Sequence, residues 1–272
     1  YRGVAARARR VANALDSLKL GFSDRVATLA WNGYRHLELY FGVSGSARVL
    51  HTVNPRLLPD QIAWILNHAE DRVLCFDMSF LPIVKGIWQH CYTSGTTGNP
   101  KAALYSHRST VLHAYAAALP DVMCLSARDS VLPVVPMFHV NAWGLPYSAA
   151  LTGCKLVFPG AAMDGKSIYE LMEAEGVTFA AGVPTVWQML LGHMGQNKLR
   201  FSTLTRTVIG GSACPPAMID TFREQYGVDV LHAWGMTEMS PLGTLCTLKE
   251  KHLKLPAQEQ MKLRLKQGRA IF

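Results

Sequence analysis

The chain has 272 residues, with 27 Lys and Arg against 19 Asp and Glu, and a formal net charge of +8. Hydrophobic residues make up 49% of it and charged residues 17%, which excludes an intrinsically disordered protein. Domains commonly have about 150 residues, so this length predicts two compact units. The positive charge favours anionic partners, a class that includes nucleotides, nucleic acid, coenzyme A and a membrane surface.

Neither a secretory leader nor a membrane span is predicted. The first residues are basic and no apolar leader segment follows them. The most apolar run, over 131–138, is short and contains two prolines, so no transmembrane helix is expected. The six cysteines form no CxxC pair and show no zinc-site spacing with His. We therefore expect buried, reduced thiols in a cytoplasmic protein.

The first part of the chain alternates helices and strands. The predicted order is helix 2–20, strand 25–31, helix 34–46, strand 49–53, helix 59–70 and strand 72–77. Asn32 is expected to cap the second helix, and Gly42 and Gly45 within it indicate close packing on a sheet. The strands are apolar without polar alternation, which is typical of a parallel sheet covered on both faces.

The same alternation resumes after residue 125. The predicted order is strand 130–135, strand 155–158, helix 167–175, strand 178–181, helix 185–192, strand 207–209, helix 216–226 and strand 229–232. The fold class is therefore α/β, with two doubly wound, mostly parallel sheet subdomains flanked by helices. We place these subdomains at 1–125 and 126–272, with packing of residues 1–25 on the second subdomain left open.

The stretch from Tyr92 to Lys101 carries the strongest chemical signal. Four hydroxyl side chains and two glycines fall within Thr93–Gly98, after a predicted strand end, and Lys101 follows. Glycines let backbone N–H groups turn towards an anion, hydroxyls add neutral donors, and the lysine adds a positive charge. This pattern predicts a polyphosphate cradle, although its spacing differs from a Walker A loop. The alternative is a polar surface turn.

Two further clusters come directly after predicted strands. Gly210–Ala213 follows one strand, and the run from His232 to Glu238 follows the next. Ligands of open α/β sheets bind beyond the carboxyl ends of the strands, where both clusters are expected. Trp234 offers a flat face for a base, and Glu238 offers a hard oxygen for Mg²⁺. For each residue alone, core packing or solvent exposure is the alternative interpretation.

Together with Pro136–His139, these clusters occur in the order found in AMP-forming acyl-CoA synthetases, which the sequence resembles over nearly its whole length. Residues 26–32 and 51–56 look like those of bacterial medium- or long-chain fatty-acid CoA ligases and of ligases acting on 3-methylmercaptopropionate. The resemblance implies an adenylation domain that uses ATP, Mg²⁺ and coenzyme A to activate a fatty or other carboxylic acid.

The resemblance also implies roles for single residues. The expected phosphate-binding residues are Thr93, Ser94, Gly95, Thr96, Thr97, Gly98 and Lys101. The expected neighbours of the nucleotide and acyl group are Gly211, Ser212, Ala213, Trp234, Gly235, Met236 and Thr237, with Glu238 as the Mg²⁺ ligand. The expected acyl pocket includes His139, Val140, Trp143 and Val183. Thr93, Lys101, Thr237 and Glu238 are the expected catalytic residues.

Several features depart from the family pattern. Ala102 stands where the family usually has glycine, and only 13 residues separate Asp77 from Cys91 where relatives carry a longer segment. The family's mobile C-terminal domain is expected to be absent. A catalytically impaired nucleotide- or acyl-binding module is therefore the alternative to an active ligase. A nucleic-acid binder is not expected, because no known motif for it is present. Peripheral membrane contact, the acyl chain length and the oligomeric state stay open.

Overall fold

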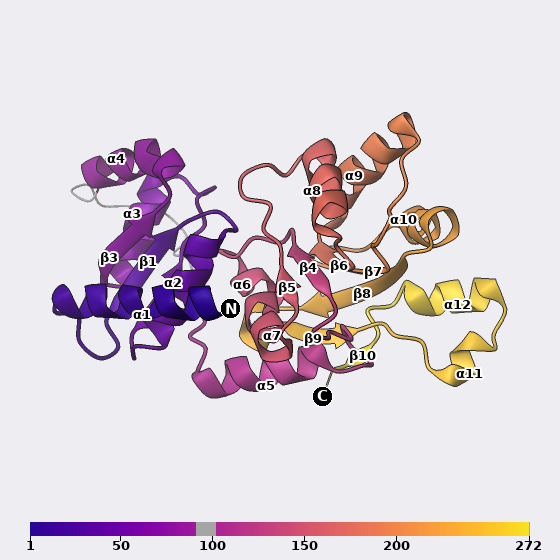
Figure 1. Cartoon of the computed structure of the whole chain (residues 1–272), viewed down its shortest axis with the longest axis horizontal. Helices are drawn as coiled ribbons and strands as arrows, with labels where there is room; N and C mark the ends of the chain where they lie inside the picture. The colour runs from indigo at the N-terminus through magenta and orange to yellow at the C-terminus, as the bar shows by residue number, and fades with distance from the viewer. Residues whose placement is uncertain (91–101, 272) are drawn as a thin grey trace. The chain divides into compact units, whose positions relative to one another are not determined.

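The computed structural model describes residues 1–90 and 102–271, and the chain forms two compact units (Figure 1). Unit 1 contains Tyr1–Ala103 and Pro136–Asn141, and unit 2 contains Leu104–Val135 and Ala142–Phe272. The sequence placed the division at 125–126, whereas the structure groups residues 104–125 with unit 2. Helix α5, His107–Ala118, lies in this stretch and packs on α7, Leu145–Thr152, of the same unit.

Unit 1 is built on a three-stranded parallel sheet with the order β2-β1-β3. Its elements are α1 Arg2–Ser17, β1 Arg25–Leu29, α2 Tyr34–Ser44, β2 Val49–Thr52, α3 Pro59–His68, β3 Asp71–Phe76, the 3₁₀ turn η1 Met78–Phe80 and α4 Leu81–His90. Neither η1 nor α4 was expected. Helix α4 ends at His90, and the strand end expected directly before Thr93 lies outside the described residues.

Alternate residues of β1 contact opposite layers of unit 1, as the two-residue period of a strand requires. Ala27 and Leu29 pack with residues of α3, η1 and α4. Val26 faces the other side and packs with Leu15 of α1 and Val43 of α2. The basic helix α1 therefore packs through its apolar residues on α2 and on the sheet of unit 1.

Three residues of unit 1 have roles other than those expected. Asn32 does not cap α2, which begins after Gly33; its Oδ1 accepts the N–H of Met137 at 2.6 Å. A Cβ on Gly42 would lie 2.7 Å from the Ala8 carbonyl oxygen. The glycine therefore allows close packing of α2 against helix α1, and not against a sheet as expected. Gly45 is the residue after α2, and a Cβ on it would lie 2.5 Å from the carbonyl oxygen of Phe41 in the same helix.

Unit 2 contains a seven-stranded sheet with the order β10-β9-β8-β7-β6-β4-β5. The strands from β5 to β8 are parallel, whereas β9 and β10 are antiparallel additions. The strands are β4 Ser130–Pro133, β5 Lys155–Leu156, β6 Phe179–Gly182, β7 Arg206–Ile209, β8 Asp229–Gly235, β9 Leu242–Leu245 and β10 Arg269–Ala270. The mostly parallel α/β prediction is confirmed, and β9 and β10 are strands that the sequence did not predict.

Helices lie on both sides of this sheet (Figure 1). One face carries α8, α9 and α10, whose apolar residues form a single buried cluster with the strands. Helices α5 and α7 lie on the opposite side. Helix α6, Val140–Trp143, begins in the last residues of unit 1 and ends in unit 2. The remaining elements of unit 2 are α8 Gly165–Glu175, α9 Pro184–Asn197, α10 Pro216–Asp220, the π-helical turn η2 Thr221–Gln225, the 3₁₀ turn η3 Thr237–Met239, α11 Glu250–Leu253 and α12 Ala257–Arg264.

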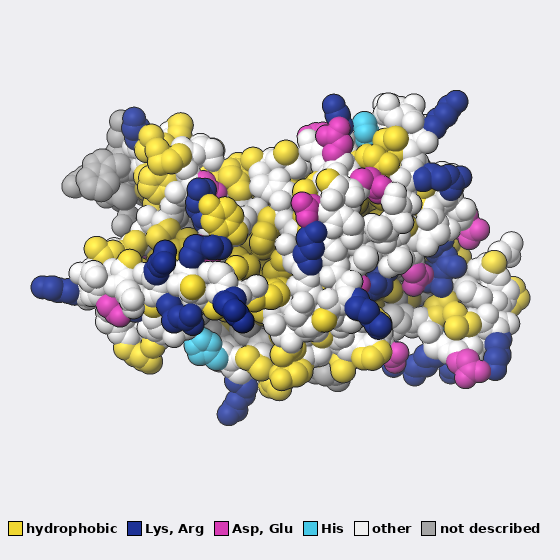
Figure 2. Space-filling view, in the orientation of Figure 1, with side chains coloured by type: hydrophobic (Ala, Val, Ile, Leu, Met, Phe, Trp, Pro, Cys, Tyr) yellow, Lys and Arg dark blue, Asp and Glu magenta, His cyan; other side chains and the backbone are white. Residues whose placement is uncertain are grey.

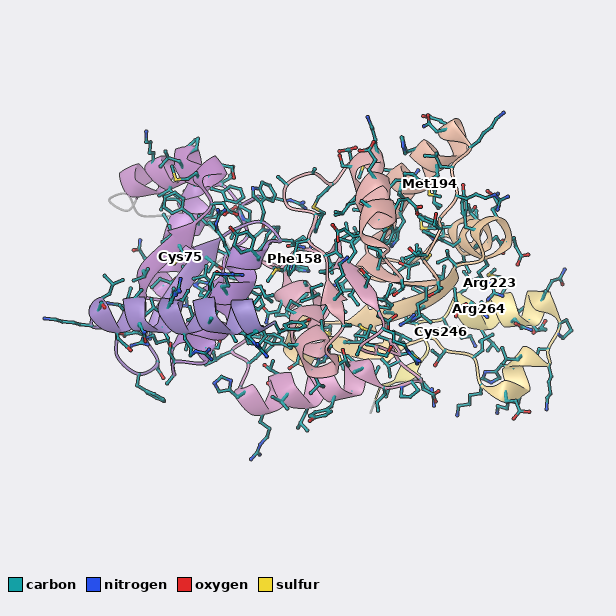
Figure 3. The ribbon with its side chains drawn as sticks, viewed as in Figure 1. Cys75, Phe158, Met194, Arg223, Cys246 and Arg264 are labelled. Atoms are coloured by element: carbon teal, nitrogen blue, oxygen red, sulfur yellow. The ribbon has the colours of Figure 1, made fainter. Side chains whose placement is uncertain are left out.

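An ion-pair cluster holds α12 beside the first residue of β8 (Figure 3). The Arg264 guanidinium lies 2.9 Å from Oδ1 of Asp229, and Arg223 approaches the same oxygen at 3.5 Å. Arg264 is 8% exposed, and removal of Asp229 would leave its charge buried and less well compensated. This cluster lies at the end of β8 opposite to the predicted site residues.

The described cysteines are free thiols, as expected, but they are not all buried. Cys124 is exposed and Cys75 is partly buried, whereas the other three are buried. Burial raises the pKa of the Cys214 thiol to about 12, so that this sulfur is unreactive at neutral pH. Cys91 lies outside the described residues. No helix in the described part of the chain is long and apolar enough to span a bilayer.

Candidate functional site

Two of the predicted clusters lie side by side in unit 2. Strands β7 and β8 are parallel neighbours, with Ile209 opposite His232. The residues after β7 and the last residues of β8 therefore share one edge of the sheet. A Cβ on Gly210 would lie 3.1 Å from the carbonyl oxygen of Ala233, which shows how closely the two segments approach. The sheet thus joins segments that are separated by about twenty residues in sequence, as expected for the carboxyl edge of a parallel sheet.

The second cluster differs from the prediction in one respect. Trp234 and Gly235 belong to β8 itself, where Trp234 lies opposite Thr244 of β9. Trp234 is 42% exposed, so its ring is available to a ligand even though the residue is part of the sheet. Thr237 and Glu238 follow in the short turn η3, and both are exposed. The exposed predicted residues of this edge are Gly211, Ser212, Ala213, Trp234, Gly235, Met236, Thr237 and Glu238.

An apolar wall borders the two glycines. A Cβ on Gly211 would lie 3.2 Å from Cγ1 of Val183, and one on Gly210 would lie 3.3 Å from Cη2 of Trp143. Gly211 has φ +80°, a conformation that glycine adopts without steric cost. Trp143 is buried and Val183 is partly buried. The structure therefore brings the predicted acyl-pocket residues Trp143 and Val183 against the Gly210–Gly211 segment.

The other two predicted pocket residues, His139 and Val140, belong to unit 1. Their segment is fixed there from two sides. Asn32 accepts the N–H of Met137, and the Tyr40 hydroxyl donates to the carbonyl of the same residue. His139 itself is exposed. Because these residues and the pair Trp143 and Val183 belong to different units, their grouping into one pocket stays a prediction.

Helix α6 is a left-handed turn. Its four residues, Val140, Asn141, Ala142 and Trp143, have φ values of 42°, 55°, 49° and 56°. L-residues pay roughly 1–2 kcal/mol each in this conformation, and a β-branched side chain is among the least suited to it. The turn ends at Gly144, with φ +77°. Contacts of the surrounding structure must therefore hold this segment, which carries two of the predicted pocket residues.

Tyr105 is a site residue that the sequence reasoning missed. Its hydroxyl donates a hydrogen bond to the carbonyl oxygen of Thr237, and burial, followed by the negative charge of Glu238, raises the pKa of its phenol. Burial, followed by the charge of Tyr105, also raises the pKa of Tyr147. Tyr105 therefore lies against the η3 turn. A lone tyrosine after a glycine-rich loop has no pattern that predicts this contact.

Two buried histidines position the same edge. Nε2 of His113 on α5 accepts the N–H of Leu242 at 3.0 Å, at the start of β9 and just after η3. Burial lowers the pKa of His113 to about 4, which keeps this nitrogen unprotonated near neutral pH. Nε2 of His232 accepts the N–H of Cys214 at 3.3 Å, while its Nδ1 donates to the Leu265 carbonyl at 3.1 Å. His232 thus ties the segment after β7 to β8 and to the end of α12.

The predicted phosphate loop lies outside the described residues. This applies to Thr93, Ser94, Gly95, Thr96, Thr97, Gly98 and Lys101, so the expected cleft shared by this loop and Glu238 stays a prediction. Among the residues that the structure describes, no three His, Cys, Asp or Glu side chains gather closely enough to hold a metal ion. Glu238 could therefore be one carboxylate ligand of Mg²⁺. Such sites are common for Mg²⁺, which takes its other ligands from substrate phosphates and water.

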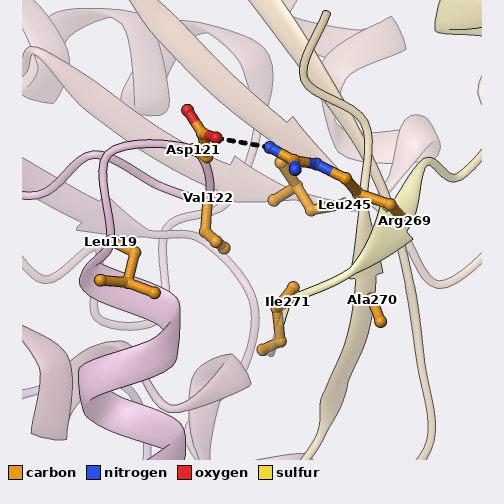
Figure 4. Close-up of a pocket in the computed structure, with 7 residues that line it drawn as sticks. All are labelled: Leu119, Asp121, Val122, Leu245, Arg269, Ala270 and Ile271. Atoms are coloured by element: carbon orange, nitrogen blue, oxygen red, sulfur yellow. Dashed lines mark hydrogen bonds and ion pairs between the residues drawn. The ribbon is translucent and has the colours of Figure 1, made fainter. Parts of the chain in front are cut away.

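Figure 4 shows a pocket of unit 2 that is lined by residues before β4 and by residues of β9 and β10. It has a volume of about 300 Å³, and an ion pair of 2.5 Å between Arg269 and Asp121 closes one side. Its lining residues are Leu119, Asp121, Val122, Leu245, Arg269, Ala270 and Ile271. None of the predicted site residues is among them, so this pocket is not the predicted nucleotide or acyl site.

The family model of the AMP-binding enzymes matches residues 1–85 and 87–272. The chain belongs to this family. The interruption at residue 86 falls within α4, ahead of the predicted phosphate loop. The resemblance drawn from the order of the sequence clusters is therefore confirmed.

Curated relatives of the chain are CoA ligases. It is 48% identical over 320 residues to the 3-methylmercaptopropionyl-CoA ligase of Ruegeria lacuscaerulensis, covering 99% of this chain and 59% of the relative. It is also 48% identical over 323 residues to the medium-chain-fatty-acid–CoA ligase of Ectopseudomonas oleovorans, covering 100% and 59%. The chain thus spans about 59% of the length of these relatives. Because the second alignment runs over 323 positions, the relative has internal residues that this 272-residue AMP-binding chain lacks.

Solved structures show the same fold. The anthranilate CoA ligase AuaEII, crystallised in complex with anthranoyl-AMP, superimposes with a TM-score of 0.82 at 22% identity. The match covers 90% of this chain and 55% of that protein. Together with the family match, this likeness confirms the predicted α/β adenylation-domain fold.

Proposed function

We propose that the chain supplies the nucleotide- and acid-binding part of an AMP-forming acyl-CoA ligase, which activates a fatty or other carboxylic acid with ATP. The observation that carries this proposal is the exposed edge formed by Gly210–Ala213 and Trp234–Glu238, on neighbouring parallel strands of an AMP-binding family member. The relatives' names support the acid and coenzyme A as further substrates. The products would be acyl-CoA, AMP and pyrophosphate.

In this proposal the adenine ring stacks on Trp234, whose exposed face is available beside Gly235 and Met236. Gly211, Ser212 and Ala213 border the adenine and the acyl group, and Thr237 contacts the α-phosphate. The β- and γ-phosphates bind to Thr93, Ser94, Gly95, Thr96, Thr97, Gly98 and Lys101. The positive charge of Lys101 and the backbone N–H groups of a glycine-rich loop suit these anionic groups.

The chemistry needs no general base. A carboxylic acid has a pKa near 4 and is ionised at neutral pH, so its oxygen can attack the α-phosphorus directly. The difficulty is to bring one anion to another and to stabilise the departing pyrophosphate. Preorganised N–H groups and Lys101 address that electrostatic problem. Mg²⁺, with Glu238 as its protein ligand, would supply further neutralisation of the phosphate charge.

The acid is proposed to bind against Val183 and Trp143, with His139 and Val140 as further walls. Val183 and Trp143 already contact the Gly210–Gly211 positions, so an acyl chain there would lie beside the adenine-binding segment. An apolar wall favours an apolar acid, because burial of each methylene is worth about 0.8 kcal/mol. Coenzyme A would then attack the acyl-adenylate through its thiol and release AMP. We place this activity in the cytoplasm.

Two measurements on the full chain test the proposal. An ATP titration tests nucleotide binding, and exchange of labelled pyrophosphate into ATP, dependent on a fatty acid, tests adenylate formation. We expect binding and acid-dependent exchange, with AMP release across a panel of acids giving the preferred chain length. Binding without exchange would contradict the ligase activity, and absence of ATP binding would overturn the site assignment as well.

Lys101→Ala tests the phosphate loop separately from the strand edge. Loss of one charge-assisted contact is expected to weaken ATP binding by about tenfold or more. Lys166→Ala on the exposed face of α8 is the matched control, because it removes the same charge far from the clusters in sequence and should leave ATP binding unchanged. Unchanged ATP affinity in Lys101→Ala would count against the loop assignment.

A further inference from the structure

The outward face of helix α1 is strongly basic. Leu15 and Ala8 are buried against the rest of unit 1, whereas Arg2, Arg9 and Arg10 on the opposite face are exposed. Figure 2 shows Lys and Arg side chains gathered over the part of the surface where Figure 1 draws α1. Residues 1–35 hold seven Lys and Arg against two Asp. This segment therefore carries much of the positive charge of the chain.

The charges of these three arginines are not neutralised within the described part of the chain. The neighbouring Arg7 pairs with Glu38, and Asp16 of the same helix pairs with Arg48. No ion pair is present for Arg2, Arg9 or Arg10 among the described residues. Ala8 and Leu15 supply the apolar stripe by which α1 packs on unit 1, so this packing does not require the three arginine charges.

Two large apolar side chains are exposed where α1 ends. Leu18 is 60% exposed and Phe22 is 86% exposed, and Lys19 lies between them. Lys19 and Ser23 both have positive φ values, of 58° and 62°, so the chain turns sharply here. Segments that bind membrane surfaces combine Lys and Arg with apolar side chains such as Phe and Leu. The apolar face of α1 is buried in unit 1, so Leu18 and Phe22 are the apolar side chains left exposed beside its arginines.

We infer that α1 and the turn after it bind an anionic lipid bilayer. The arginines would attract the acidic headgroups, while Phe22 and Leu18 would enter the boundary between headgroups and acyl chains. A nucleic acid would also attract the arginines, but it offers an aliphatic side chain such as Leu18 no comparable apolar environment. The bilayer is therefore the partner that uses both features of the surface.

Vesicle binding by the full chain tests this inference without reference to ligase activity. Vesicles of phosphatidylcholine with phosphatidylglycerol are compared with vesicles of phosphatidylcholine alone, by sedimentation at low and high salt. We expect binding to the anionic vesicles only, weakened by salt because the attraction is electrostatic. The triple variant R2Q/R9Q/R10Q should bind on the order of a hundredfold more weakly, at about fivefold for each charge.

Matched control variants show whether vesicle binding depends on this surface, or only on the net charge and the exposed apolar side chains of the chain as a whole. K198Q/K251Q/K266Q removes three exposed charges from unit 2 and should bind like the unchanged chain. Phe22→Ser should weaken binding by about tenfold, whereas Leu253→Ser, at another exposed leucine, should not. Circular dichroism of each variant checks that it folds.

Three results would overturn the inference. The first is equal binding of the R2Q/R9Q/R10Q variant and the unchanged chain to anionic vesicles. The second is equal binding of the chain to anionic and neutral vesicles. The third is no vesicle binding together with arginine-dependent binding of duplex DNA, which would assign the surface to nucleic acid.

Discussion

The Tyr105 hydroxyl donates a hydrogen bond to the main-chain carbonyl of Thr237, across more than a hundred residues of sequence. Thr237 and Glu238 belong to the same short turn, and the charge of Glu238 contributes to the raised pKa of Tyr105. The tyrosine therefore fixes the backbone of the turn that carries the proposed Mg²⁺ ligand. This contact gives a test of the site geometry that does not depend on catalysis.

Glu238→Gln is expected to lower the pKa of Tyr105, because it removes the negative charge that disfavours the phenolate. Ultraviolet absorbance titration follows tyrosine ionisation, and comparison with Tyr105→Phe assigns the signal. Glu224→Gln, at an exposed position on η2, removes the same charge elsewhere and should leave that titration unchanged. An identical Tyr105 titration in Glu238→Gln and the unchanged chain would show that the two side chains are not close.

Tyr105→Phe removes the hydrogen bond and keeps the ring. We expect the free energy of unfolding to fall by about 1 kcal/mol, and the affinity for ATP to fall with it because the turn is less well held. Tyr115→Phe is the control, since Tyr115 is 57% exposed on α5. Urea denaturation measures the first effect and ATP titration the second. Unchanged stability in Tyr105→Phe would contradict the contact.

Gly211→Ala should lower the free energy of unfolding more than Gly227→Ala does. Gly211 and Gly227 have φ values of +80° and +67°, so alanine at either costs roughly 1–2 kcal/mol. A Cβ at 211 would also lie 3.2 Å from Val183, whereas nothing lies within 4 Å of one at 227. Denaturation of both variants isolates the crowding. Val183→Ala in the Gly211→Ala background should recover part of the stability, and a failure to do so would argue against the contact.

Asn32→Ala tests how the segment 136–141 is held in unit 1. The N–H of Met137 would lose its acceptor in a buried environment, which costs about 1–3 kcal/mol of unfolding free energy. Asn13→Ala on the exposed face of α1 is the control, and its effect should be within about 0.5 kcal/mol. Thermal and urea denaturation measure both. Equal effects of the two substitutions would show that Asn32 acts as an ordinary surface residue.

Acidification is expected to destabilise the chain through His113. Its pKa is lowered from 6.5 to about 4 in the folded state by burial, so between these pH values the unfolded chain binds a proton that the folded chain does not. The unfolding free energy therefore rises with pH in this window. The contribution is complete above pH 6.5 and is lost as the pH falls towards 4, at a cost of about 3 kcal/mol.

His113→Gln isolates this contribution. Its amide oxygen can accept the N–H of Leu242 but takes up no proton, so the pH dependence between 6.5 and 4 should become shallower. Urea denaturation at several pH values gives the comparison. His36, whose pKa is also lowered to about 4, continues to titrate in this variant, so the dependence is reduced and not abolished. An unchanged slope would show that His113 titrates normally in the folded chain.

Much of the fold could be predicted from local sequence patterns. Apolar runs such as that of β1 predict strands, and periodic apolar residues such as those of α1 predict helices, because these signals arise from neighbouring residues. Helices α4, α5 and α7 were not predicted. The residues of α7 are buried on several sides, which erases the amphipathic period on which the prediction depends. Strand β9 pairs antiparallel with β8, the strand directly before it, but it has only four residues and three of them are buried, so it shows no clear two-residue alternation.

The sequence by itself determined the family, the α/β class and the order of the ligand-binding clusters, because glycines, hydroxyls and strand patterns follow one another within short stretches of chain. Only the tertiary structure decided that Asn32 accepts a hydrogen bond from Met137 and does not cap a helix, that Gly42 packs against α1, and that Trp234 lies within β8. It alone paired Tyr105 with Thr237 and His113 with Leu242. The contacts of Asn32, Gly42, Tyr105 and His113 join residues far apart in the chain, and their proximity results from the packing of whole elements and not from any spacing in the sequence.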